Sequence, residues 1–169
     1  MKEARVLIAC IGNIFLGDDG FGVEVARRFA DRSLPPGVVL KDFGIRGLDL
    51  TYALLEPYDL VILVDAIQSG GAPGTLYVIE PEAAEAADSA VLDAHSLNPR
   101  KVLRAVKEMG GTLGQILIVG CEPADLGPEE GKLGLSEPVA AALDEALLLI
   151  ESLVSKVRSG TLEKVLRVH

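Results

Sequence analysis

The stretch VLIACIGNIFLGDDGFG, residues 6–22, joins an apolar run to two adjacent carboxylates and then to a helical pattern. The apolar run, taken over residues 5–11, is typical of a buried strand, and residues 20–32 repeat apolar side chains at helical spacing. Ionised carboxylates such as Asp18 and Asp19 stay in water unless a cation meets them. Two acids held between a buried strand and a helix therefore predict a cation at this turn, and first of all a metal ion.

The rest of the chain alternates strand and helix patterns. Further strands are expected from residue 38 and over 58–65, 75–80 and 115–122, and further helices over 47–56, over 96–109 and from Ser136, as N-cap, to Ser159. The connection before 75–80 is too short for a crossover helix, so that strand should run antiparallel. This order predicts an α/β three-layer sandwich, with a twisted, mostly parallel sheet of about five strands and helices on both faces. Residues 1–160 should form a single domain, followed by a tail over 161–169.

Composition narrows the possible functions. Apolar residues make up 49% of the 169, which suits a packed globule, whereas aromatic residues make up only 4% and the formal net charge is −9. Few stacking rings and a negative charge argue against nucleic acid and against anionic membranes as partners. Cys10 and Cys121 lie at strand ends and are expected to be buried free thiols. No stretch is long enough to span a bilayer, so a soluble cytoplasmic protein is expected. A monomer is the default expectation for its oligomeric state.

The expected topology brings distant polar residues together. Ligands of doubly wound sheets bind at the carboxyl ends of strands, where the strand order reverses. If the first strand neighbours the third, Asp19 and Asp65 should meet there, and His95 lies in a connection that can return to the same end. Taken alone, Asp65 could accept backbone N–H bonds, and His95 could cap a helix or face solvent. Together they form a reasonable ligand set for nickel, zinc or a similar divalent ion, with positions left open for a substrate.

Motifs of other enzyme classes do not occur. The chain has no GxxxxGK[ST] phosphate loop, no GxGxxG fingerprint and no GxSxG elbow. A flavodoxin-like nucleotide binder is therefore a weak alternative, because the acidic first turn would repel phosphate.

The chain resembles the hydrogenase maturation proteases, endopeptidases that trim the C-terminus of the [NiFe]-hydrogenase large subunit. The most specific part of the likeness is GNIFLGDDGFG, residues 12–22, which resembles a GN-x-L-x-x-D-[DE]-x-x-G signature. The likeness continues through Asp42-Phe43-Gly44, VDAI (64–67), APGT (72–75), Ala94-His95 and GCEP…GLSEPV (120–139). The resemblance implies that Asp19, Asp65 and His95 contact the metal and that Asp42 contributes to activity.

The resemblance also implies a nickel-dependent endopeptidase that removes the C-terminal extension of a large-subunit precursor after metal insertion. Nickel would be carried by the precursor, and another divalent ion could replace it in vitro. The metal is then either a recognition tag or a Lewis acid, and the general base is either Asp42 or Asp19. The alternative from another class is a non-proteolytic assembly chaperone that binds the metal or the precursor.

One segment departs from the family's pattern. The family often has Asp-Gly-Gly-Thr where this chain has Asp-Phe-Gly-Ile-Arg-Gly, residues 42–47. Phe43 and Arg46 therefore place a ring and a cation near an acidic site. Arg46 is expected either to bind a precursor carboxylate or to pair with Asp18 or Asp42. Asp18 itself is expected as a helix N-terminal cap or as a partner behind the metal site.

Overall fold

A computed structural model describes residues 3–81 and 97–162. The five strands form one sheet in the order β2-β1-β3-β5-β4. The strands are β1 (Val6–Ile11), β2 (Val38–Gly44), β3 (Leu60–Ala66), β4 (Leu76–Ile79) and β5 (Gln115–Cys121). The helices are α1 (Phe21–Phe29), α2 (Gly47–Ala53), α3 (Pro99–Glu108), α4 (Glu137–Ala141) and α5 (Leu143–Ser159), with a 3-10 turn η1 (Gly17–Gly20). Within the described ranges, no helix is both long and apolar enough to cross a bilayer.

The pairing of the strands confirms the expected topology. β1 pairs in parallel with β2 on one side and with β3 on the other, and β3 pairs in parallel with β5. β4 runs antiparallel and pairs with β5 at the edge of the sheet. The strand order therefore reverses at β1, and the carboxyl ends of β1 and β3 lie side by side there. Doubly wound sheets bind their ligands at such a reversal point.

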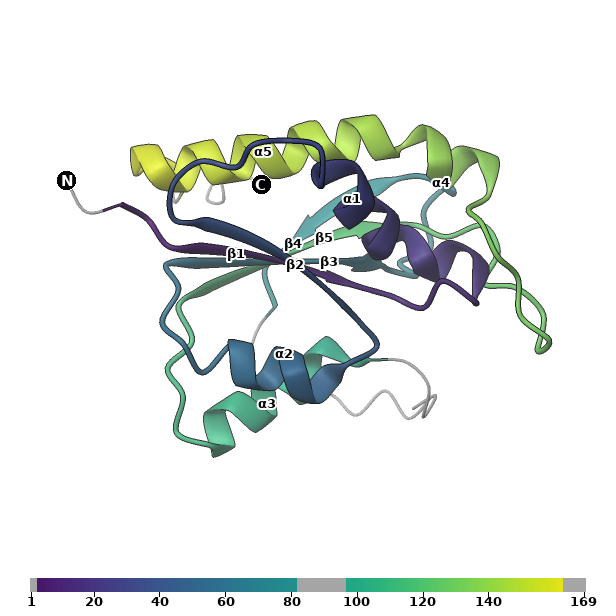
Figure 1. Ribbon diagram of the computed structural model, residues 1–169. Helices are drawn as coiled ribbons and strands as arrows, with labels where there is room; N and C mark the ends of the chain where they lie inside the picture. Colours follow the sequence, from purple (N-terminus) through teal and green to yellow (C-terminus); the bar gives the residue numbers. More distant parts are fainter. Residues whose placement is uncertain (1–2, 82–96, 163–169) are drawn as a thin grey trace.

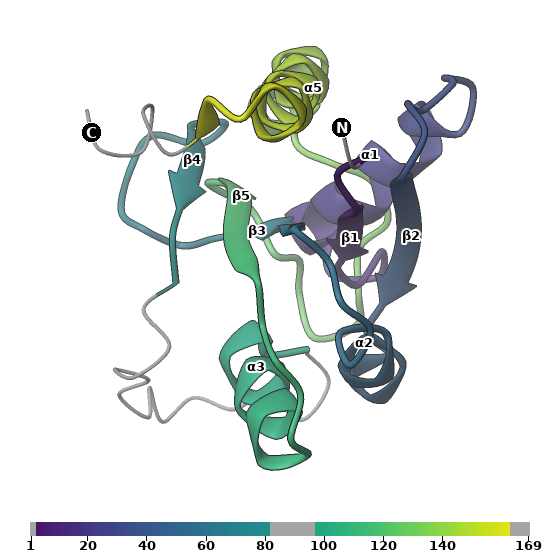
Figure 2. The ribbon, with the colours of Figure 1, turned by 90° about the vertical axis from the view of Figure 1, so that its left-hand side faces the viewer.

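Helices cover both faces of the sheet. α1 and α5 lie on one face, and α2 and α3 lie on the other (Figure 1, Figure 2). Every residue of β1 is buried, and successive side chains point to opposite faces. Val6, Ile8 and Cys10 join the core under α1 and α5, whereas Leu7, Ala9 and Ile11 join the core over α2 and α3. This double burial explains why β1 is continuously apolar rather than alternating.

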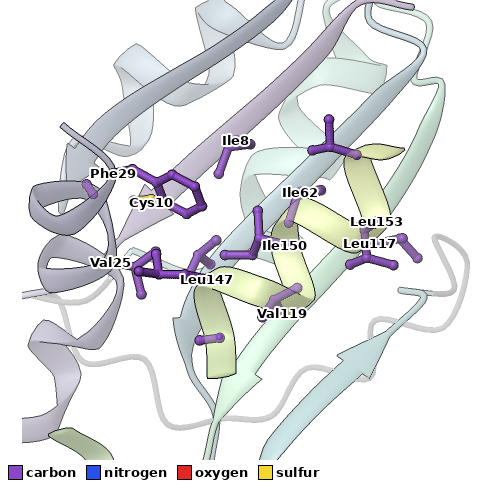
Figure 3. Close-up of a cluster of buried hydrophobic side chains, with 14 of the residues drawn as sticks. Ile8, Cys10, Val25, Phe29, Ile62, Leu117, Val119, Leu147, Ile150 and Leu153 are labelled. Carbon is purple, nitrogen blue, oxygen red and sulfur yellow. The ribbon is translucent and has the colours of Figure 1, made fainter. Parts of the chain in front are cut away.

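The core between the sheet and α5 is aliphatic apart from the rings of Phe21 and Phe29 on α1 (Figure 3). Leu147, Ile150 and Leu153 of α5 meet Ile62 and the neighbouring strands, as the sequence pattern of this helix predicts. The expected single helix is interrupted at Ala142, so that α4 and α5 are separate elements. Leu162 also belongs to this core, and the domain boundary at residue 160 stays a prediction.

Both cysteines are buried free thiols, as predicted. Burial raises the pKa of Cys10, with a smaller contribution from the charge of Asp42, and burial raises the pKa of Cys121 to about 11. Thiols with raised pKa are poor nucleophiles, so neither cysteine is a candidate for the chemistry.

The substitution Ile150→Ala should lower the free energy of unfolding by about 2–5 kcal/mol, because it opens a cavity at a fully buried position. Leu148 lies on the same helix with 64% of its surface exposed, so Leu148→Ala is a matched control that should change stability by less than about 0.5 kcal/mol. Urea denaturation of both variants measures the difference. Equal stability of the two variants would contradict this packing of α5.

Candidate active site

Two glycines allow the turn after β1 to fold back onto the sheet. A Cβ on Gly12, whose φ is +153°, would lie 2.1 Å from the main-chain oxygen of Asp19. A Cβ on Gly22 would lie 2.2 Å from the oxygen of Ile11 and 2.5 Å from that of Val64. Such distances exclude any side chain at either position. The glycines of the motif therefore let η1 and the start of α1 sit directly against the carboxyl ends of β1 and β3.

Asp19, in the turn after β1, and Asp65, at the end of β3, are close enough for their charges to interact. The N–H of Asn13 donates to Asp19 Oδ2 at 2.9 Å, and the N–H of Ala66 donates to Asp65 Oδ1 at 2.8 Å. Burial raises the pKa of Asp65 well above its usual value, and the negative charge of Asp19 raises it further. A proton or a cation stabilises two carboxylates that repel each other in this way.

Asp18 points the opposite way, into the protein, and is fully buried. Its carboxylate accepts hydrogen bonds from the N–H groups of Ala124 at 2.8 Å, Asp125 at 2.9 Å and Ser136 at 2.7 Å, and from the Ser136 hydroxyl at 2.8 Å. Burial alone would raise the pKa of Asp18, but these hydrogen bonds outweigh it and hold the pKa below its usual value. Asp18 is thus an anchor between the turn after β1 and the loop after β5.

These contacts correct two expectations. Asp18 does not cap a helix, because its partners are N–H groups of the loop over 124–136 rather than of the helix that follows it. Ser136 does occupy the residue before α4, but its hydroxyl donates to Asp18 instead of capping α4. Both errors have the same cause: the sequence does not show which distant loop meets a buried carboxylate.

Asp42 lies at the carboxyl end of β2, opposite Cys10. It is exposed, and its Oδ1 accepts the N–H of Gly44 at 2.8 Å. A bulge follows, because Cys10 pairs with Asp42 while the next residue, Ile11, pairs with Gly44. The extra residue, Phe43, is fully buried in the core over α2 and α3, so its ring does not line the acidic site.

Arg46 pairs with neither of the two expected carboxylates. Its guanidinium forms an ion pair with Asp49 at 3.3 Å and donates to the main-chain oxygens of Asp42 and Phe43. The expectation that it pairs with Asp18 or Asp42 side chains is therefore wrong, and the binding of a precursor carboxylate by Arg46 stays a prediction. Its contacts fix the main chain at the end of β2.

His95 lies outside the described residues, so its position relative to Asp19 and Asp65 stays a prediction. Over residues 3–81 and 97–162, no group of three or more His, Cys, Asp and Glu side chains is arranged to hold a metal ion. Of the three residues expected to contact a metal ion, the structure therefore places Asp19 and Asp65.

Glu122 is a site-supporting residue that the sequence analysis did not single out. It follows β5 directly, is 4% exposed, and accepts hydrogen bonds from the N–H of Ser69 at 2.9 Å, the N–H of Gly71 at 2.7 Å and the hydroxyl of Tyr77 at 2.9 Å. It thereby fixes the turn that follows the strand of Asp65. An acid placed directly after an apolar strand, the same signal that identified Asp65, could have drawn attention to it.

A family model described as hydrogenase maturation protease matches residues 23–153. The chain belongs to this family. It is 31% identical to the hydrogenase maturating endopeptidase HybD from E. coli, covering 92% of this chain and 94% of that one with a TM-score of 0.76. The maturation protease HycI from Thermococcus kodakarensis is 28% identical over 90% of this chain and 94% of its own, with a TM-score of 0.69. The expression/formation protein HupD of Rhizobium leguminosarum is 34% identical over 157 residues, which are 92% of this chain and 75% of HupD.

These likenesses confirm the α/β fold and the enzyme class predicted from the sequence: the protein is an endopeptidase of the hydrogenase maturation protease family. The family match begins at residue 23, just after the motif that carries Asp18 and Asp19.

Asp18→Asn should destabilise the protein by about 1–3 kcal/mol, because an amide nitrogen would face N–H donors that now meet a buried carboxylate oxygen. Asp144→Asn is the control, since the side chain of Asp144 is 84% exposed and pairs only at the surface, with Arg28. Urea denaturation at neutral pH compares the two variants. Wild-type stability of Asp18→Asn would show that the buried carboxylate does not hold the two loops together.

Glu122 should make the protein sensitive to acid. Burial alone would raise its pKa, but hydrogen bonds from Ser69, Tyr77 and Gly71 hold the pKa below its usual value. Such a group adds stability above its unfolded pKa of about 4.3 and loses it as the pH falls toward the folded pKa. Between about pH 5 and about pH 3, the unfolding free energy of Glu122→Gln should therefore fall less steeply than that of the wild type.

The control for this pH series is Glu129→Gln, which removes an exposed glutamate of the loop after β5. Its unfolding free energy should follow the wild type across the series. If Glu122→Gln also follows the wild type, Glu122 is not held as a carboxylate by its three neighbours.

Proposed function

We propose that this protein is a nickel-dependent endopeptidase that removes the C-terminal extension of a [NiFe]-hydrogenase large-subunit precursor after metal insertion. The observation that carries the proposal is the pair Asp19 and Asp65, at the reversal point of the sheet, in a chain of this family. The proposal includes a monomeric enzyme that works in the cytoplasm. Nickel enters as part of the substrate, already held by the precursor.

The charge arrangement favours a substrate-borne cation. Asp19 lies in the turn after β1 and Asp65 lies at the end of β3, and their negative charges repel each other. A divalent ion that binds to both carboxylates relieves this repulsion. A precursor that carries nickel is thereby preferred over one that does not, and His95 is proposed as the third contact. Another divalent ion could fill the same role in vitro.

The proposed reaction is hydrolysis of a peptide bond beside this ion. A bound divalent ion can polarise the scissile carbonyl or lower the pKa of the attacking water. The protein supplies the general base, which is Asp19 or Asp42. Asp42 is exposed at the end of the neighbouring strand β2 and is free of metal contact in this proposal, so it suits the base if Asp19 is occupied by the ion.

The test mixes the protein with nickel-loaded and nickel-free precursor and follows the precursor by mass spectrometry. Loss of the C-terminal extension is expected only in the nickel-loaded mixture. Asp19→Asn, Asp65→Asn and His95→Ala should each abolish this cleavage. For Asp19 and Asp65 the fold should persist, because neither side chain belongs to the aliphatic core.

Asp31→Asn, at an exposed aspartate after α1, is the control and should cleave like the wild type. Normal cleavage by any of the three site variants would remove that residue from the proposed site. A stable complex with the precursor but no change in its mass would instead support a binding chaperone and refute the protease.

A further inference from the structure

A groove of about 450 Å³ opens beside the acidic turn, between the start of α1, the loop after β5 and α4. Gly17 and Gly20 line it, and these two residues flank Asp18 and Asp19 in the chain. Figure 1 shows the loop after β5 passing the same end of the molecule as the start of α1. The groove is therefore continuous with the turn that carries Asp19.

The walls of the groove present apolar side chains to solvent. Ile14 is 45% exposed and Leu133 is 69% exposed, and both line the groove. Their loops are joined by main-chain hydrogen bonds, from Gly17 N–H to the Lys132 oxygen at 2.8 Å and from Lys132 N–H to the Phe15 oxygen at 2.7 Å. The two side chains are thus held outward by fixed backbone, in a position that suits an apolar partner.

The groove also carries positive charge in an acidic protein. Arg27 and Arg28 of α1 line it together with one acid, Glu24, while the whole chain has a formal net charge of −9. Arg27 pairs with Glu24 at 3.2 Å and Arg28 pairs with Asp144 at 3.2 Å, and both arginine side chains remain exposed. Exposed ion pairs of this kind are weak, so an incoming carboxylate can replace the partner of Arg28.

We propose that this groove binds the precursor segment next to the scissile bond. An apolar side chain of the segment lies between Ile14 and Leu133, and a carboxylate of the segment meets Arg28. The proposal rests on the proposed function, because it assumes that a peptide held at Asp19 continues into the adjoining groove. The carboxylate comes either from an acidic side chain or from the C-terminus of the precursor.

The experiment measures processing of the nickel-loaded precursor by Leu133→Asp and Arg28→Gln. Each should lower kcat/KM by about tenfold or more, chiefly through a higher KM, because each removes binding that ground state and transition state share. Matched controls lie outside the groove. Leu148→Asp changes a leucine that is 64% exposed on α5, and Arg32→Gln changes an arginine that pairs at the surface with Glu151. The controls should change kcat/KM by less than about twofold.

The possible outcomes distinguish a failure of the groove proposal from a failure of the proposed function. If the wild type cleaves the precursor and a groove variant processes it as fast as its control, the groove proposal is wrong and the proposed function is unaffected. No cleavage by the wild type would overturn both.

Two precursor changes identify the source of the carboxylate. Acidic residues near the cleavage site are replaced by their amides, or the precursor is extended by several residues beyond its C-terminus. The change that slows the wild type but has no further effect on Arg28→Gln marks the group that meets Arg28. If neither change slows the wild type, no carboxylate binds there and the proposal is wrong.

Discussion

The buried carboxylate of Asp18 is the contact on which the site depends. It accepts three main-chain N–H groups and one hydroxyl from residues 124–136, more than 100 positions away in the chain. A buried charge is stable only when its hydrogen-bonding capacity is met, and here the loop after β5 meets it. This side chain therefore joins the turn that carries Asp19 to the loop after β5, together with main-chain hydrogen bonds between the two segments.

Neighbouring acids take different roles because their surroundings differ. Asp18 turns inward to N–H donors, which hold its pKa below the usual value. Burial raises the pKa of Asp65, at the end of β3, and the charge of Asp19 raises it further. The hydrogen bonds of Asp18 therefore stabilise its charge, whereas the charges of Asp19 and Asp65 oppose each other. This difference is why the proposed cation contact is assigned to Asp19 and Asp65 and not to Asp18.

The sequence predicted the layers, the sheet and the meeting of strand ends, because these follow from local patterns: continuous apolar runs for β1 and β3 and helical spacing for α1 and α5. It did not predict the partners of Asp18, the pairing of Arg46 or the role of Glu122. Those depend on which loops meet in space, and no local pattern encodes a contact between residues 18 and 136. The bulge that buries Phe43 was missed for the same reason, since it arises from pairing with β1.

The burial of Phe43 changes where substrate selectivity should be sought. The segment 42–47 departs from the family's pattern, yet its ring is in the core and its arginine is held by Asp49 and by main-chain oxygens of the same segment. The residues that differ from the family's pattern in this segment therefore pack and hydrogen-bond at the end of β2. The groove differs, because Ile14 and Leu133 are exposed apolar side chains on loops that main-chain hydrogen bonds join. Side chains that are already positioned but not yet buried lose little freedom on binding, so they are the better candidates for reading a peptide.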